Sequence, residues 1–261
     1  MTRSSYLLAL VGSLAIGACS TSRADTTHPD ADPGSVATAS PHAPMLYVIG
    51  VDVSDSFQTS ERVEQARSLI EGVIQRMSYG DAIAVVETFR SGSDSVGSWT
   101  DSIPREHRPG APTRNEQHRL AQFKQRAVTL AGGFVHPPKA ASSTDILALV
   151  QRASDYAKAA QLHGRSTTLL VVSDMMNYTN DLRMTGAASI PAESWVSKQK
   201  AQGLVPELPG VCVAVSGADV STPRGIAVRN FWQSYFKAAG ANFSPERYRK
   251  LMLDPDEVSC S

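Results

Sequence analysis

The sequence predicts an α/β fold, in which a doubly wound and mostly parallel sheet carries helices on both faces. Two observations predict it. Short apolar runs rich in Val, Ile and Leu alternate along the chain with segments of helical periodicity. The apolar runs also end in polar or turn-forming residues, as buried strands do. The expected strands are residues 46–53, 82–89, 167–173 and 211–215, with a short edge strand at 95–100.

The first helix is predicted over residues 60–77, because its apolar residues recur at helical spacing: Val63, Ala66, Ile70, Val73 and Met77. Thr113 and Glu116 form a capping box that opens the next helix. That helix should turn Leu120, Phe123, Ala127 and Leu130 inward and end at Gly132-Gly133.

Four more helices complete the expected pattern. One follows residues 142–145 and runs to about residue 161, and another covers 193–202 with Gly203 as its stop. An amphipathic helix spans 224–239, with Ile226 among its apolar residues, and Gly240 closes it. Ser244-Pro-Glu predicts a last short helix, so the folded domain, residues 45–261, should end in a helical tail.

The first residues are typical of an export signal. Arg3 precedes an apolar segment, residues 7–18, that is too short for an ordinary transmembrane helix. The segment ends Ile16-Gly17-Ala18-Cys19, which resembles the lipobox of bacterial lipoproteins. That resemblance implies lipidation at Cys19, and Ser20 then implies sorting to the outer membrane, on its periplasmic face, if the host is Gram-negative. An ordinary signal peptide over residues 1–19 is the alternative.

Residues 20–44 are rich in Ser, Thr, Ala, Pro and Asp and should form a disordered tether. The chain has 25 basic and 25 acidic residues and no basic run, which argues against nucleic acid as a partner. Beyond Cys19 only Cys212 and Cys260 remain. In an oxidising compartment they would form a disulfide that anchors the C-terminal tail, and two free thiols are the alternative.

Oxygen-bearing side chains follow the first strand at a spacing of two. They are Asp52, Ser54 and Ser56. In an open α/β sheet, ligands bind beyond the carboxyl ends of the strands. Carboxylate and hydroxyl oxygens suit Mg²⁺, Mn²⁺ or Ca²⁺ better than softer metals. The sequence therefore predicts a divalent-cation site at this edge of the sheet.

Two later residues stand at comparable places: Thr144 at a helix start and Asp174 after a buried strand. In this order, with Asp-x-Ser-x-Ser after the first strand, they resemble the metal-ion-dependent adhesion site of von Willebrand factor A domains. The resemblance covers residues 45–240 and implies a Rossmann-like fold. It implies that Ser54, Ser56 and Thr144 bind the metal through hydroxyls, and that Asp52 and Asp174 supply charge. A partner's Asp or Glu would complete the coordination.

Residues around these positions are candidates for a partner-binding rim. Asp55 departs from the family, which often has Gly between the two serines, and adds negative charge at the mouth. Asp145 is either a first-turn helix acid or a rim residue. The loop after Asp174 would border the metal, and its residues either present apolar surface to a partner or pack under the loop: Met175, Met176, Asn177 and Tyr178.

Three functional hypotheses follow. The first is a membrane-tethered, cation-dependent protein-binding module of the cell envelope that is not an enzyme, with Mg²⁺ (or Mn²⁺ or Ca²⁺) as cofactor and a protein bearing an exposed Asp or Glu as partner. The second is a metal-assisted hydrolase with Asp52 as nucleophile, although phosphatases of the haloacid dehalogenase type need a second Asp where this chain has Ser54. The third is a structural lipoprotein with a vestigial metal site, in which the polar residues only cap helices.

Overall fold

The computed structural model describes residues 43–88, 97–104, 112–137, 141, 143–252 and 254–260. The predicted signal peptide with Cys19 and all but the end of the predicted tether lie outside the described residues. Residues Pro41–Ser261 form one compact unit. Within the part of the chain that is described, no helix is both long and apolar enough to cross a membrane.

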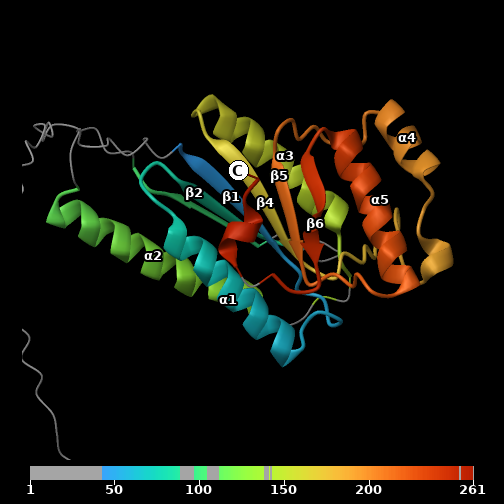
Figure 1. Cartoon of the computed structure of the whole chain (residues 1–261), viewed down its shortest axis with the longest axis horizontal. Coiled ribbons are helices and arrows are strands. Elements are labelled where there is room, and N and C mark those ends of the chain that lie inside the picture. The colour runs from blue at the N-terminus through green and yellow to red at the C-terminus, as the bar shows by residue number, and fades with distance from the viewer. Residues whose placement is uncertain are drawn as a thin grey trace, which may run out of the picture. The chain divides into compact units, whose positions relative to one another are not determined.

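A six-stranded, mostly parallel sheet forms the centre of the domain (Figure 1). Its strands are β1 Met45–Val51, β2 Ala82–Glu87, β3 Ser98–Ser102, β4 Ser166–Val172, β5 Cys212–Ser216 and β6 Asn242–Arg249. Their order is β3-β2-β1-β4-β5-β6. Only β3 is antiparallel to its neighbour, and it lies at the edge, as predicted for this segment. The predicted fold class is confirmed.

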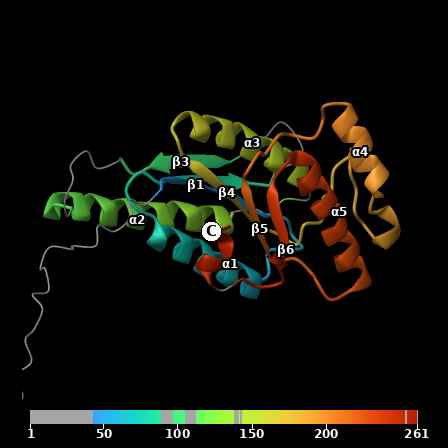
Figure 2. The same ribbon diagram turned by 45° about the horizontal axis from the view of Figure 1, so that its top comes forward.

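Helices cover both faces of this sheet (Figures 1 and 2). The helices α1 Ser60–Arg76 and α2 Arg114–Val135 pack on one face. The helices α3 Ile146–Leu162, α4 Glu193–Ala201 and α5 Pro223–Ala239 pack on the other. The two layers give two separate apolar cores, one on each side of the sheet.

Alternation along the central strands divides the apolar side chains between the two cores. On β4, Leu169 and Val171 face α3 and α5, whereas Leu170 and Val172 face α1 and α2. All four are buried. Complete burial of such a side chain contributes about 1.5–3 kcal/mol relative to leaving it exposed. Since both faces are covered, β4 is apolar without interruption from Leu169 to Val172, and the chain becomes polar again at Ser173.

The helix starts follow the predicted capping chemistry. Thr59 accepts a hydrogen bond from the Arg62 amide at the start of α1. Thr113 and Glu116 form the predicted capping box of α2. At the other end of a helix, Gly240 closes α5 with φ of 78°, a conformation that glycine adopts without a steric penalty.

Helix α2 differs from the prediction. Gly132-Gly133 do not end it, because the helix continues to Val135, which is buried in the core. Burying a Val side chain offsets the cost of about 1 kcal/mol per helical glycine. Leu130, predicted to point inward, is 39% exposed, and its neighbour Ala131 takes the core position. On α5, Ile226 is likewise exposed.

The predicted last helix is also wrong, because Ser244-Pro-Glu lies within β6. The strand pairs with β5 and buries Tyr248, with an irregularity in register between Val213 and Val215. Proline is tolerated here because β6 is an edge strand. In the described residues of the tail, the helical piece is the 3₁₀ turn Pro255–Val258.

The tail is held against α1 and β5 by three kinds of contact. Cys212 on β5 and Cys260 form a disulfide, with their Cα atoms 5.6 Å apart. Val258 is buried in the core beneath α1. Arg76, at the end of α1, pairs with Asp254 at 3.0 Å and with Asp256 at 3.2 Å.

We expect the Cys260→Ser variant to lose about 2–4 kcal/mol of unfolding free energy, because the bridge closes a loop across a sequence separation of 48 residues. Urea unfolding of the variant and of the oxidised parent measures the difference. The reduced parent serves as control and should match the variant. Equal midpoints for variant and oxidised parent would show that the tail does not depend on the bridge.

Candidate metal centre

The candidate centre lies where the neighbouring strands β1 and β4 end. Val51 and Val172 are partners in the parallel pairing, so the residues that follow them emerge side by side. The Asp52 amide continues the ladder by donating to the Val172 carbonyl at 2.9 Å. Asp52 after β1 and Asp174 after β4 therefore approach each other at the carboxyl edge of the sheet.

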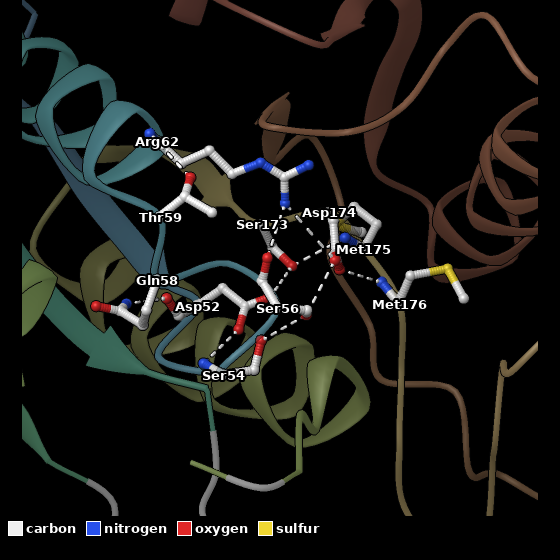
Figure 3. Close-up of polar contacts among 10 residues, drawn as sticks. All are labelled: Asp52, Ser54, Ser56, Gln58, Thr59, Arg62, Ser173, Asp174, Met175 and Met176. Atoms are coloured by element: carbon white, nitrogen blue, oxygen red, sulfur yellow. Dashed lines mark hydrogen bonds and ion pairs between the residues drawn. The ribbon is translucent and has the colours of Figure 1, made fainter. Parts of the chain in front are cut away.

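Asp52 is fully buried, and both of its carboxylate oxygens accept hydrogen bonds (Figure 3). One oxygen accepts from the Ser54 amide at 2.9 Å. The other accepts from the Ser173 hydroxyl at 2.6 Å. These bonds fix the direction of the carboxylate without a basic side chain beside it.

The predicted serines connect Asp52 to Asp174. The hydroxyl oxygens of Ser54 and Ser56 lie 3.2 Å apart, within hydrogen-bond distance. Ser56 then donates to the Asp174 carboxylate at 3.3 Å, as Figure 3 shows. The second Asp174 oxygen accepts from the Met176 amide at 3.0 Å. The row of oxygens thus runs from one strand end to the other.

Thr144 joins this group from another part of the chain. It lies just before α3 and is buried, and its carbonyl accepts from the Tyr178 amide at 2.7 Å. Together with Ser54, Ser56 and Asp174 it lines one open depression of about 350 Å³. The structure therefore brings all five predicted ligands to one place, four in the wall of the depression and Asp52 directly below Ser54.

The site holds two acidic side chains, Asp52 and Asp174, with little positive charge nearby to balance them. Burial raises the pKa of the Asp52 carboxyl to about 6, and the negative charge of Asp174 adds to the rise. Hydrogen bonds from Ser173 and Ser54 act in the opposite direction. Arg62 of α1 is the cation found at Asp174, with its guanidinium 3.9 Å from the carboxylate and donating to the Ser56 carbonyl at 3.2 Å.

This donor set fits a hard divalent cation. Two carboxylates and three hydroxyls supply only oxygen, which Mg²⁺, Mn²⁺ and Ca²⁺ prefer. A cation would also relieve the cost of a buried carboxylate beside a second one. Among the described residues, no cluster of three or more His, Cys, Asp and Glu side chains could hold a metal ion, so the hydroxyls are essential to the fit.

Of the six residues predicted for the rim, three line the depression and three do not. Asp55, Met176 and Tyr178 line the depression, and Tyr178 is 41% exposed. Met175 and Asn177, in contrast, are fully buried and cannot contact a partner. They pack under the loop, which is the other alternative that the sequence left open.

Asn177 and Asp145 both serve the start of α3. Asn177 accepts from the Ile146 amide at 2.8 Å and donates to the Leu182 carbonyl at 2.9 Å, so it links the loop to the helix. Asp145 is the N-cap and accepts from the Ala148 amide at 2.9 Å. It is therefore neither a first-turn acid nor a residue of the depression.

Three residues of the site were missed from the sequence. Ser173 bonds to Asp52, Arg62 approaches Asp174, and Arg224 at the start of α5 lines the depression. Ser173 had a signal, because it is the first polar residue after the apolar run of β4. The two arginines had none, since arginines are common in the first turns of solvent-facing helices.

A larger depression, of about 430 Å³, lies at the opposite end of β2, where Leu46, Ala82 and Arg165 contribute to its lining. Its one acidic side chain, Asp101, pairs with Arg126 at 2.6 Å. It lacks the converging acids of the candidate metal centre.

No protein-family model and no curated protein matches the sequence. Solved structures similar to the chain include an aerotolerance-related membrane protein from Bacteroides fragilis (14% identity, TM-score 0.39). Others are manganese-loaded TRAP protein from Plasmodium vivax (13%, 0.38) and a von Willebrand factor type A protein from Catenulispora acidiphila (12%, 0.30). The matches cover 76%, 82% and 76% of this chain, and 89%, 70% and 43% of those proteins. At these identities and scores, the fold class rests on the chain's own sheet order.

We expect the metal-free protein to lose stability as the pH rises through about 6. The folded state raises the pKa of Asp52 to about 6 from 3.8, so the folded state holds this proton more tightly than the unfolded state does. The stabilisation that the Asp52 proton gives the folded state is complete below about pH 4 and lost above about pH 7. It amounts to about 3 kcal/mol of unfolding free energy at most.

Denaturant unfolding in chelator at several pH values tests this expectation. The Asp52→Asn variant is the reference, because its amide imitates the neutral carboxyl and does not titrate. The stability of the parent relative to the variant should fall with pH. A difference that is constant with pH would contradict the raised pKa.

Proposed function

We propose that this chain is a protein-binding module that depends on a divalent cation, Mg²⁺ first and Mn²⁺ or Ca²⁺ as alternatives. The observation that carries the proposal is the continuous row of Ser54, Ser56 and Asp174 oxygens above the buried carboxylate of Asp52. The row opens onto a depression at the carboxyl edge of the sheet. We propose that such a site binds a partner and does not catalyse a reaction.

The ligand roles follow from exposure and charge. Ser54, Ser56 and Thr144 would hold the cation through their hydroxyls, because all three line the depression. Asp52 and Asp174 would supply the negative charge that keeps it there. The bound cation supplies a Lewis acid that accepts a carboxylate from outside. We therefore propose a protein with an exposed Asp or Glu as the partner.

The walls of the depression favour such a partner. Met176 and Tyr178 offer apolar surface, and Arg224 offers a positive charge. Arg183 lies over the Tyr178 ring, 4.9 Å from its centre, and holds the ring in place. Asp55 adds a negative charge on the same wall and would disfavour partners with several acidic residues around the bound one.

We further propose that the domain is tethered to the cell envelope through a lipid on Cys19, on the periplasmic face of the outer membrane if the host is Gram-negative. The lipobox pattern at the start of the sequence supports this proposal. Detection of a lipid-modified N-terminal cysteine by mass spectrometry would test it, with the Cys19→Ser chain as control.

Removing single hydroxyls should identify the site. We expect Mg²⁺ to bind the purified protein, and Thr144→Ala and Ser56→Ala each to weaken the binding roughly tenfold to a hundredfold. Calorimetric titration gives the dissociation constants. Ser197→Ala, which removes an exposed hydroxyl on α4, is the matched control and should bind like the parent. Equal affinity in all four proteins would refute the assignment of these ligands.

The same titrations separate the other two hypotheses. Metal-dependent hydrolysis of a phosphoester that is lost in Asp52→Asn would favour the hydrolase. A parent protein that shows neither heat nor metal-linked thermal stabilisation would favour a structural role with a vestigial site.

Arg62 should have the opposite effect on the cation. Its guanidinium lies 3.9 Å from Asp174 and competes electrostatically with a bound metal. We expect Arg62→Gln to tighten Mg²⁺ binding by about twofold to fivefold at low salt, since a unit charge about 4 Å away contributes on the order of 1 kcal/mol in water. High salt should reduce the gain.

The control is Arg67→Gln, which makes the same change of charge at an exposed position on the same helix. It should change the affinity far less than Arg62→Gln does. Weaker binding in Arg62→Gln than in the control would mean that Arg62 supports the metal site and does not oppose it.

A further inference from the structure

We propose that Trp232 is a positioning residue for the metal centre, because its indole fixes the backbone that carries Asp174. The proposal rests on the proposed function, since it concerns the ligand geometry of the same site. Trp232 is on α5 and fully buried, and its indole contacts the loop that follows Asp174.

The loop needs fixing because its backbone is strained directly after Asp174. Met175 has φ of 63° and is the only non-glycine residue with positive φ in the described part of the chain. For an L residue with a long side chain, this conformation costs on the order of 1 kcal/mol or more. Such strain persists only where surrounding contacts hold it.

Three buried hydrogen bonds hold it here. The Trp232 indole nitrogen donates to the Met175 carbonyl at 2.9 Å. The Met175 amide donates to the Ser173 hydroxyl at 2.9 Å, and that hydroxyl donates to Asp52 at 2.6 Å. Figure 3 shows the two of these hydrogen bonds that link Met175 to Ser173 and Ser173 to Asp52. The Met175 amide and carbonyl belong to the two peptide units that follow the Asp174 Cα, so the backbone directly after Asp174 is held.

The indole itself has little freedom to move. Its ring packs edge-on against Phe231 and Tyr235, with ring centres 5.1 Å and 5.5 Å away, and lies 5.9 Å from Phe236. All three neighbours are buried on α5. The same helix places Arg224 in the wall of the depression. One hydrogen bond, from the Trp232 indole to the Met175 carbonyl, thus connects α5 to the residue next to Asp174, a proposed metal ligand.

The decisive variant is Trp232→Phe, which keeps an aromatic ring and removes the N–H donor. We expect its affinity for Mg²⁺ to fall about fivefold, because a net hydrogen bond contributes about 1 kcal/mol. Calorimetry on the full chain, well below the unfolding temperature, measures this affinity. Trp195→Phe is the control. Trp195 packs at a tilt against the same cluster, with its ring centre 5.7 Å from that of Phe231, and its replacement should change affinity less than twofold.

A second variant, Ser173→Ala, breaks the same chain nearer to Asp52 and guards against poor folding of Trp232→Phe. We expect it to weaken Mg²⁺ binding at least fivefold. If the three bonds act as one unit, the double variant should lose less than the product of the two single losses. If instead the loss of affinity in the double variant equals the product of the two single losses, Trp232 acts on the centre independently of Ser173.

Amide hydrogen exchange in chelator provides a readout without metal. The amides of residues 174–177 should exchange faster in Trp232→Phe than in the parent and in Trp195→Phe. If Trp232→Phe changes neither exchange nor affinity relative to the control, the indole only satisfies its own hydrogen bond and the proposal is overturned. If the parent binds no Mg²⁺, the proposed function fails with the positioning role, whereas unchanged affinity in the variant defeats the positioning role alone.

Discussion

The candidate site depends on one constraint, the complete burial of the Asp52 carboxyl between the ends of β1 and β4. A carboxylate in that place must be protonated, paired or given hydrogen bonds, because desolvation of the charge is costly. Two hydrogen bonds reach it, from the Ser54 amide and the Ser173 hydroxyl, while the nearby guanidinium of Arg62 pairs with Asp174. The pKa of Asp52 is therefore raised, and the proposed divalent cation would place positive charge beside the carboxylate.

The surrounding hydroxyls follow from the same constraint. Further carboxylates beside Asp52 and Asp174 would add repulsion that the fold would have to bear without metal. Serine and threonine supply oxygen without charge, so a site made of them folds in either state. With only two carboxylates among the five proposed ligands, a bound divalent ion would be neutralised without excess by its own ligands and would still attract an anionic group from a partner. This balance distinguishes a receptor for carboxylates from a closed structural metal site.

Periodicity predicted most of the fold because the central strands β1, β2, β4 and β5 are covered on both faces and are largely apolar. It failed where tertiary contacts outweighed local signals, at Gly132-Gly133 and at Ser244-Pro-Glu. Four of the five proposed ligands were predictable because they follow the ends of β1 and β4, and Thr144 was predictable from its place before a helix. Arg62, Arg224 and Trp232 were not, since helix packing brings them to the site and no spacing in the sequence encodes that packing. The burial of Met175 and Asn177 likewise depends on how the loop folds back onto α3 and α5.

The borders of the site are held from two sides, which argues for a preformed centre. Helix α1 carries Arg62 near the site and is fixed at its far end by the ion pairs of Arg76 with the disulfide-linked tail. Helix α5 is fixed through its aromatic cluster and holds Met175. The last strand, β6, is hydrogen-bonded into the sheet beside β5. Because the proposed ligands are already close together, binding of a cation should require little rearrangement of the protein. The charge of the site, and not a conformational change, should therefore determine its affinity for a cation.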